Sequence, residues 1–236
     1  MTLDEFCDHF LAFRESGRSD DDFVKDHGAD LIERLSDMHS EDVRWIRDAL
    51  EDQTRKWFVA SVFTYLPLLV HEDLFLPMIR AAIYEIDPSF NQYFVKPCIR
   101  TYGHRRVNEA LLEFFEKGSD FEKAGAANAL YWARLGFAFQ GRVPAYTREY
   151  ATPESVAAYD ALADIWVRRG CLFLETFVEN QDLHVRRSII PALRLDVSHY
   201  PDELGPLVAT AIHIARNHED EYIRHRVEVQ LEKYDC

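Results

Sequence analysis

The feature that most constrains the fold of this chain is a recurring turn that contains an aspartate and is followed by an amphipathic helical pattern. Five such turns occur, and their aspartates are Asp52, Asp87, Asp120, Asp182 and Asp220. Three of the four intervals between them, 35, 33 and 38 residues, have the length of one helical hairpin, and the fourth, 62 residues, is longer. A second helical pattern lies between successive turns. We therefore expect a repeating unit of helix, turn and helix whose apolar faces are buried by stacking on neighbouring units.

Apolar residues recur at three- and four-residue spacing along the whole chain, which predicts an all-α fold. Near the start this stripe is Leu3, Phe6, Phe10 and Phe13. Signals for β-strands are nearly absent, since no Asn-Gly or Asp-Gly pair and no sustained alternation occurs. Residues 1–50 match the repeating unit poorly, and residues 1–52 hold 16 acidic against 6 basic side chains. We predict an acidic helical N-terminal cap over residues 1–50 and a repeat array over residues 51–236.

The last two turns carry a more specific pattern. "VRR" (Val185–Arg187) follows Asp182 and precedes Pro191, and "YIRHR" (Tyr222–Arg226) follows Asp220. This pattern resembles the HEAT repeats, and the resemblance implies a right-handed α-α superhelix, an α-solenoid, of about five helical hairpins. It also implies a structural ladder across adjacent repeats that is made by the turn aspartates and the arginines after them, Asp182 with Arg186 and Asp220 with Arg224. Such solenoids have many unrelated functions, so the resemblance concerns architecture rather than activity.

The long interval contains the one irregular stretch, "RLGFAFQGRVPAYTREYATPES" (Arg134 to Ser155), with a loop near residues 137–152. A loop of this length in a compact array is either functional or disordered. It interleaves aromatic residues with arginines, and the candidate binding residues are Arg134, Phe137, Phe139, Arg142, Tyr146 and Arg148. These side chains can stack on a ring or hold an anion. Packing of the loop onto the helical array is the alternative, and we favour it. The outline GxxxxG within the loop lacks the Lys-Ser/Thr that a phosphate loop requires.

Basic residues also recur on the helices that follow the aspartate turns, and we take Arg187 and Arg226 as candidate partner-binding residues on the concave side of the array. The alkylpurine DNA glycosylases, a related helical-repeat family, bind DNA with such a surface. Those enzymes are strongly basic, whereas this chain has a net charge of −14 and an isoelectric point near 5.1. An acidic chain repels phosphate backbones unless its basic residues are concentrated on one face. We therefore do not expect nucleic acid to be the partner.

No motif for catalysis, metal binding or cofactor binding stands out, so we expect no enzymatic activity, no metal and no cofactor. His213, His218 and His225 are spaced five and seven apart, unlike the i, i+4 pair of a helical zinc site. The four scattered cysteines and the acidic start of the chain favour a cytoplasmic protein with reduced thiols. The longest apolar run, Trp57 to Val70, is too short to span a membrane.

Together these features predict a non-enzymatic scaffold or adaptor, monomeric, that binds a protein or peptide along its concave face. One specific version is an inhibitor of a basic partner, which the acidic N-terminal region favours. The alternative is a small-molecule-binding or lyase-like helical-repeat protein. Under this alternative, the chain resembles the bilin lyases, which share its short helical hairpins, and the Tyr, Trp and Arg residues near 131–150 would hold a ring system.

Overall fold

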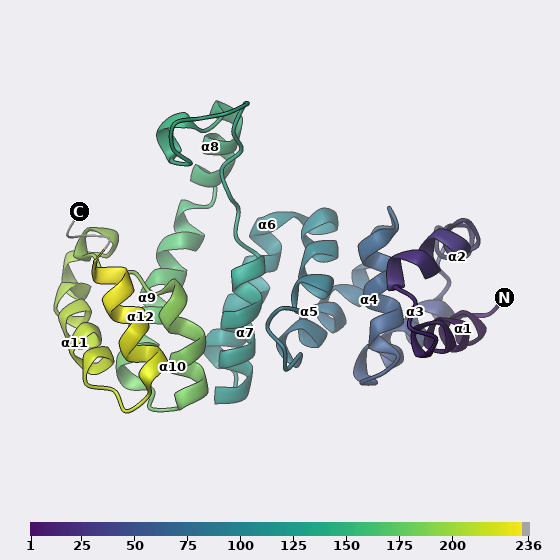
Figure 1. Cartoon of the computed structure of the whole chain (residues 1–236), viewed down its shortest axis with the longest axis horizontal. Coiled ribbons are helices and arrows are strands. Elements are labelled where there is room, and N and C mark those ends of the chain that lie inside the picture. The colour runs from purple at the N-terminus through teal and green to yellow at the C-terminus, as the bar shows by residue number, and fades with distance from the viewer. Residues whose placement is uncertain (233–236) are drawn as a thin grey trace. The chain divides into compact units, whose positions relative to one another are not determined.

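The computed structural model describes residues 1–232, and every regular element in them is helical. The prediction of an all-α fold is therefore confirmed. These residues form twelve α-helices and five short 3-10 helices (Figure 1). The chain divides into two compact units, one of residues Met1–Ala110 and one that begins at Leu111. No helix within residues 1–232 combines the length and the apolarity that crossing a bilayer requires.

The first unit is built around α4. Its elements are α1 (Leu3–Glu15), α2 (Asp20–Leu35), α3 (Ser40–Glu51), α4 (Lys56–Tyr65), the 3-10 helix η1 (Glu72–Leu74), α5 (Phe75–Ile83) and the first part of α6 (Gln92–Lys117). Helices α1, α2 and α3, which cover the residues of the expected cap, all pack against α4. The ring of Phe10 lies 5.2 Å from that of Phe23 and 5.7 Å from that of Phe58, in edge-on contacts. The apolar stripe of the first helix is thus part of an aromatic core.

Two polar or strained features lie inside this unit. The ammonium of Lys56 is buried, and its Nζ donates to Glu85 Oε2 at 2.7 Å and to Gln53 Oε1 at 2.8 Å. Helix α6 is interrupted at Gly103, whose φ of +79° and ψ of 165° lie outside the range of residues that have a side chain. Only glycine adopts this conformation without strain, so Gly103 sets the direction of the second half of α6.

The second unit contains the second part of α6 and the helices that follow it. Its elements are α7 (Asp120–Trp132), η2 (Arg148–Tyr150), α8 (Pro153–Asp160), α9 (Ala163–Glu179), α10 (Leu183–Ile189), η3 (Ile190–Ala192), η4 (Val197–His199), η5 (Asp202–Leu204), α11 (Gly205–Arg216) and α12 (Glu221–Leu231). Helix α10 packs against α7 and α12, while α11 packs against α9. Ala126 and Ala129 are fully buried on α7, and their small side chains allow α10 to approach closely. The ring of Phe115 meets that of Phe173 at 4.8 Å in the core.

The repeat aspartates lie in turns or at helix starts, as the sequence predicted. Asp182 and Asp220 are the N-caps of α10 and α12, and each accepts a hydrogen bond from a backbone N–H three residues on. Asp52 Oδ1 accepts from the backbone N–H groups of Thr54 and Arg55 just before α4. A carboxylate at these places satisfies N–H groups that the helix itself leaves unpaired. The aspartate turn is therefore a local signal for the start of the next helix.

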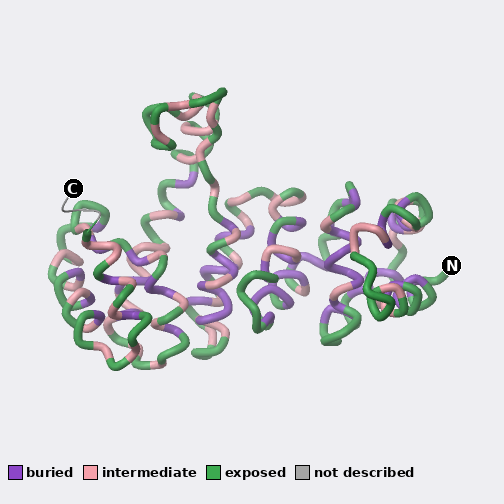
Figure 2. The backbone as a smooth tube through the Cα atoms, in the orientation of Figure 1, coloured by how far each residue is buried: buried purple, intermediate pink, exposed green. Residues whose placement is uncertain are grey.

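The stretch between α7 and α8 is irregular until η2, as expected, and no residue from Arg134 to Ala161 is buried (Figure 2). With α8, it projects from the other helices of the second unit (Figure 1). The ring of Phe137 lies 4.9 Å from that of Tyr159, and the backbone N–H of Thr152 donates to the carbonyl of Ala138 at 2.8 Å. The loop thus packs onto α8, the next helix in the chain.

Candidate functional site

Most of the loop residues that the sequence singled out contact one another or α8. The ring of Phe139 meets that of Tyr146 edge-on at 5.2 Å. The guanidinium of Arg148 donates to both carboxylate oxygens of Asp160, at 2.7 and 2.6 Å. This bidentate pair neutralises Arg148 within the loop and α8. Arg142 is exposed. These contacts give the loop an internal structure, and they bring Arg142 and Arg148 to no common pocket.

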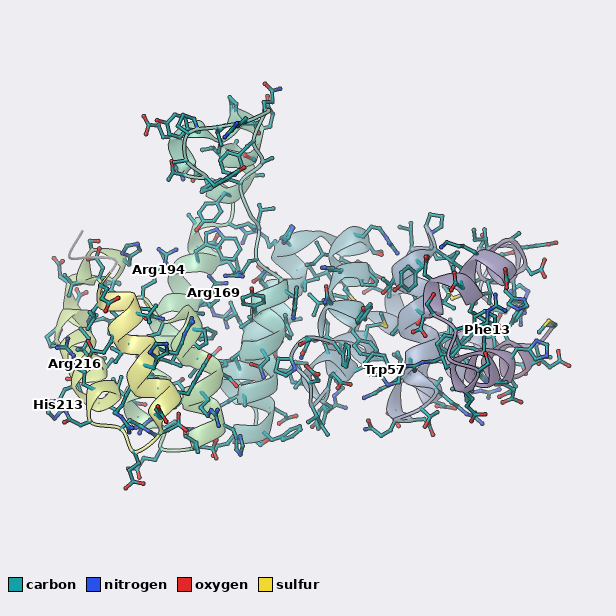
Figure 3. The ribbon with its side chains drawn as sticks, in the orientation of Figure 1. Phe13, Trp57, Arg169, Arg194, His213 and Arg216 are labelled. Atoms are coloured by element: carbon teal, nitrogen blue, oxygen red, sulfur yellow. The ribbon has the colours of Figure 1, made fainter. Side chains whose placement is uncertain are left out.

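Arg134 belongs to a different constellation, a pocket of about 370 Å³ in the second unit. We call it the arginine pocket, and its lining includes the three arginines Arg134, Arg169 and Arg194, the rings of Tyr159 and Trp166, the turn Pro191–Leu193, and Gln230. The lining contains no aspartate or glutamate. Figure 3 shows Arg169 and Arg194 near each other in this unit. Three cations therefore converge without an anion on the wall of the pocket.

Helix α9 supplies the aromatic side of the arginine pocket. Trp166 and Arg169 are three residues apart and so lie on one face of the helix. The indole N–H of Trp166 donates to the carbonyl of Tyr159 at 3.1 Å, and the two rings stack with centroids 5.4 Å apart. The guanidinium of Arg169 lies 5.0 Å from the centroid of the Trp166 ring. These contacts fix the positions of both rings and of the arginine beside them.

The end of α10 supplies the opposite side. Pro191 lacks the backbone N–H that a continued helix would use, and α10 ends at Ile189, just before the 3-10 turn η3 that contains this proline. Leu193 then has extended backbone angles, and the chain turns to present Arg194 at the surface. The hydroxyl of Tyr200 donates to the Arg194 carbonyl at 2.8 Å, which holds this segment in place. The sequence Pro-Ala-Leu-Arg thus places a cation where a continued helix would not.

Helix α12 closes the pocket through one side chain. The amide Nε2 of Gln230 donates to the carbonyl of Ile190 at 2.7 Å and so ties α12 to the η3 turn. The Oε1 atom of the same side chain is buried and has no hydrogen-bond donor among the described residues. A buried acceptor without a donor is uncommon in folded proteins. Gln230 therefore contributes to the pocket by holding α12 against the η3 turn.

The electrostatics of the pocket are those of an unneutralised cation cluster. Burial, together with the positive charges of Arg194 and Arg134, lowers the pKa of Arg169 to about 10. Tyr159 acts in the opposite direction but less strongly than Arg194. The adjacent Arg168 differs, because it is exposed and its guanidinium bonds Glu116 Oε2 at 2.7 Å. Arg168 is therefore neutralised by Glu116, whereas Arg169 is repelled by the positive charges of Arg194 and Arg134.

Arg134 joins the pocket from the end of α7. Its Nε donates to the carbonyl of Tyr131 at 3.0 Å, and its guanidinium lies 3.8 Å from the centroid of that ring. These contacts orient the side chain but leave its positive charge uncompensated. Arg134 is the one member of the loop set from the sequence that lines the arginine pocket.

The expected ladder residues make structural contacts, with a different pairing. The guanidinium of Arg186 donates to the carbonyl of Phe177 at 3.2 Å, and that of Arg224 donates to the carbonyls of His218 and Glu219. Both arginines thus bond to backbone carbonyls near their own turns. The aspartates Asp182 and Asp220 use their carboxylates as N-caps.

The ion pair between α10 and the start of α12 is made by a different arginine. The guanidinium of Arg187, on α10, lies 3.9 Å from the Asp220 carboxylate and 5.3 Å from the Tyr222 ring at the start of α12. Arg226, the other proposed partner-binding residue on these helices, has a buried Nε without a hydrogen-bond acceptor among the described residues. Neither Arg187 nor Arg226 lines the arginine pocket.

Sequence reasoning missed Arg169 and Arg194. Arg168 follows Asp164 by four residues, the ordinary spacing of an ion pair on a helix surface, and this spacing does not point to Arg169. A signal was nevertheless present, because the positions three and four residues from Arg169 are Ile165, Trp166, Leu172 and Phe173, none of them acidic. An arginine that has a tryptophan but no acidic residue beside it on its helix face is a candidate for an interaction with a group outside that helix.

Other chemistries find less support in the structure. Within residues 1–232, no three side chains among His, Cys, Asp and Glu gather as a metal ion would need. Cys7 and Cys98 are buried, and burial raises the pKa of Cys98 to about 12, which makes this thiol a poor nucleophile at neutral pH. No protein-family model, curated protein or solved structure matches this chain. The chemistry of the arginine pocket is therefore the basis on which we assign a function.

Proposed function

We propose that this protein is a non-enzymatic helical-repeat binding module, and that its arginine pocket binds an anionic group of a protein or peptide partner. The observation that carries this proposal is the convergence of Arg134, Arg169 and Arg194 in a pocket whose lining has no carboxylate. A cluster of like charges raises the free energy of the folded protein unless a counter-charge is bound. Burial is the main cause of the lowered pKa of Arg169, and the positive charges of Arg194 and Arg134 lower it further.

The three arginines of the pocket cluster in a unit whose net charge is negative. From Leu111 to the end, the chain has 20 acidic against 14 basic residues, a net charge of −6. Several of the other arginines of this unit pair with carboxylates, as Arg148 does with Asp160 and Arg216 with Glu228. Although the unit is acidic, none of its carboxylates lines the arginine pocket, so the three arginines are suited to bind an anion from another molecule.

The architecture that we propose for the module is a right-handed α-α superhelix of about five hairpins, as in the HEAT repeats. The packing order in the second unit supports it. The helices that follow the aspartate turns, α7, α10 and α12, pack on one another in chain order, and the helices between them, α9 and α11, also pack together. Two such layers are the arrangement that stacked helical hairpins produce.

The geometry favours an acidic partner segment over the basic partner that the N-terminal charge suggested. A basic partner would need a defined acidic surface, and several acids of residues 1–52 are already paired within the first unit, among them Asp42 with Arg34 and Asp26 with Arg18. The arginine pocket is by contrast a concave site with uncompensated charge. It is therefore the feature on which we base the binding role.

The test is a calorimetric titration of the full chain with two anionic probes, citrate and a hexaglutamate peptide, at low and high ionic strength. We expect saturable binding that weakens with salt and is lost in Arg194→Gln, whose side chain is exposed and whose replacement should not disturb folding. The matched control is Arg168→Gln, which removes an arginine of the same unit outside the pocket and should leave binding unchanged. The proposal is wrong if citrate, hexaglutamate and phenyl phosphate all fail to bind. It is also wrong if Arg194→Gln binds these anions as tightly as the wild type does.

A further inference from the structure

We infer that the anion for which the arginine pocket is built is a phosphate monoester rather than a carboxylate. This inference rests on the proposed function and specifies its ligand. It follows from the number and placement of the arginines, the charge they carry, and the way this same protein binds its own carboxylates.

Two ion pairs within this protein show that one arginine is enough to bind one carboxylate. Arg148 holds both oxygens of Asp160, at 2.7 and 2.6 Å, and Arg216 holds both oxygens of Glu228, at 2.8 and 3.2 Å. One planar guanidinium therefore satisfies one planar carboxylate, in charge and in hydrogen bonds. A carboxylate in the arginine pocket would leave two of the three positive charges uncompensated.

A phosphate monoester fits the three arginines better. It carries a charge of about −1.5 to −2 at neutral pH and has three terminal oxygens that accept hydrogen bonds. The three guanidinium groups belong to three different elements: Arg134 follows α7, Arg169 lies on α9 and Arg194 follows η3. Donors that arrive from separate elements suit a tetrahedral group, whose oxygens point in several directions, more than a planar one.

The rest of the pocket indicates what carries the phosphate. A volume of about 370 Å³ is several times that of the anion and leaves room for the group to which it is bonded. The rings of Tyr159 and Trp166 offer an apolar wall next to Arg169. A phosphorylated side chain of a partner protein would supply such an attached group.

A nucleic acid backbone fits less well. Each of its phosphodiesters has a single charge and two terminal oxygens, and a long polyanion must also pass along the surface of a unit that carries a net charge of −6. A single monoester that enters a pocket meets that surface over a much smaller area. The inference therefore predicts discrimination between a phosphate monoester and a phosphate diester.

The experiment uses ring-matched probes on the full chain at constant ionic strength. Phenyl phosphate, phenyl sulfate and benzoate share one ring and differ in charge and shape, and diphenyl phosphate adds the diester. Calorimetry should give an affinity for phenyl phosphate about tenfold or more above those of the other three. Arg194→Gln should weaken phenyl phosphate binding by about tenfold or more, Arg169→Met with Arg194→Gln should abolish it, and Arg168→Gln should leave it unchanged. Circular dichroism on each variant confirms that it is folded.

The outcomes separate this inference from the proposed function. If benzoate, citrate or hexaglutamate binds at the arginine pocket as tightly as phenyl phosphate, the anion-binding function stands and the phosphate inference is overturned. Preference for diphenyl phosphate or for a single-stranded oligonucleotide also overturns it, as does phenyl phosphate binding that survives both substitutions. If no probe binds, both are overturned. A second arm compares a phosphoserine pentapeptide with a nucleoside monophosphate: both are monoesters, and the tighter one identifies the source as a protein or a small molecule.

Discussion

Replacing Arg169 by methionine removes the most strongly perturbed charge of the arginine pocket while it keeps most of the side chain's apolar length. Arg169 lies partly buried beside Trp166, and its pKa falls from its ordinary value to about 10. Burial is the largest cause, followed by the charge of Arg194. We expect Arg169→Met to stabilise the ligand-free protein and at the same time to weaken anion binding.

The magnitude follows from the pKa. Each tenfold loss of proton affinity corresponds to about 1.4 kcal/mol, so this lowering corresponds to a destabilisation of roughly 3 kcal/mol at most. Solvent screening of the partly exposed side chain and the lost contact of the cation with Trp166 reduce the expected gain to about 1–2 kcal/mol. The folded-state pKa is lower than the unfolded one, so the destabilisation is fully present below about pH 10 and disappears as the pH rises from there towards the ordinary pKa of arginine.

The assay is thermal unfolding at pH 7.5 in a buffer free of phosphate and sulfate. For a chain of this length a gain of about 1–2 kcal/mol raises the midpoint of the transition by about 2–8 °C. The control Arg168→Met removes the exposed ion pair with Glu116 and should change stability by less than about 1 kcal/mol. If Arg169→Met destabilised the protein by 1 kcal/mol or more, a compensating anion would have to be present in the fold, and the reasoning about the pocket would be refuted.

Three further predictions concern the fold. Asp182→Ala removes the N-cap of α10 and should lower the free energy of unfolding in urea by about 1 kcal/mol, whereas Asp182→Asn, which keeps a capping oxygen, should lower it by less. Lys56→Met leaves the Glu85 carboxylate buried without its cation and should destabilise the protein by about 3–5 kcal/mol; adding Glu85→Gln should recover part of this loss in the same urea titration. Gly103→Ala places a side chain at a φ of +79° and should lower the thermal midpoint, with a loss of about 1–3 kcal/mol, although no atom beyond the chain neighbours and the surrounding helix backbone lies within 4 Å of the added carbon; an unchanged midpoint would show that the backbone relaxes there.

The sequence by itself determined the elements that depend on local interactions. Helices require apolar residues at three- and four-residue spacing and a cap at the start, and both signals lie within one turn of chain. Asp182 and Asp220 therefore marked the starts of α10 and α12 correctly, and Leu3, Phe6 and Phe10 marked the buried face of α1. The irregular stretch before α8 was recognisable for the same reason, because its glycines and prolines interrupt the helical spacing.

The tertiary structure alone decided which charges meet. Asp160, in α8, is the partner of Arg148 in the loop, and Arg187 rather than Arg186 is the arginine that reaches Asp220. The arginine pocket combines residues from the end of α7, from α9, from the turn after α10 and from α12, as many as 96 positions apart between Arg134 and Gln230. Such convergence depends on how the helices pack and where Pro191 redirects the chain. A linear sequence encodes each cation but not the distance between them, and this distance determines whether they are a solvated surface or a site for an anion.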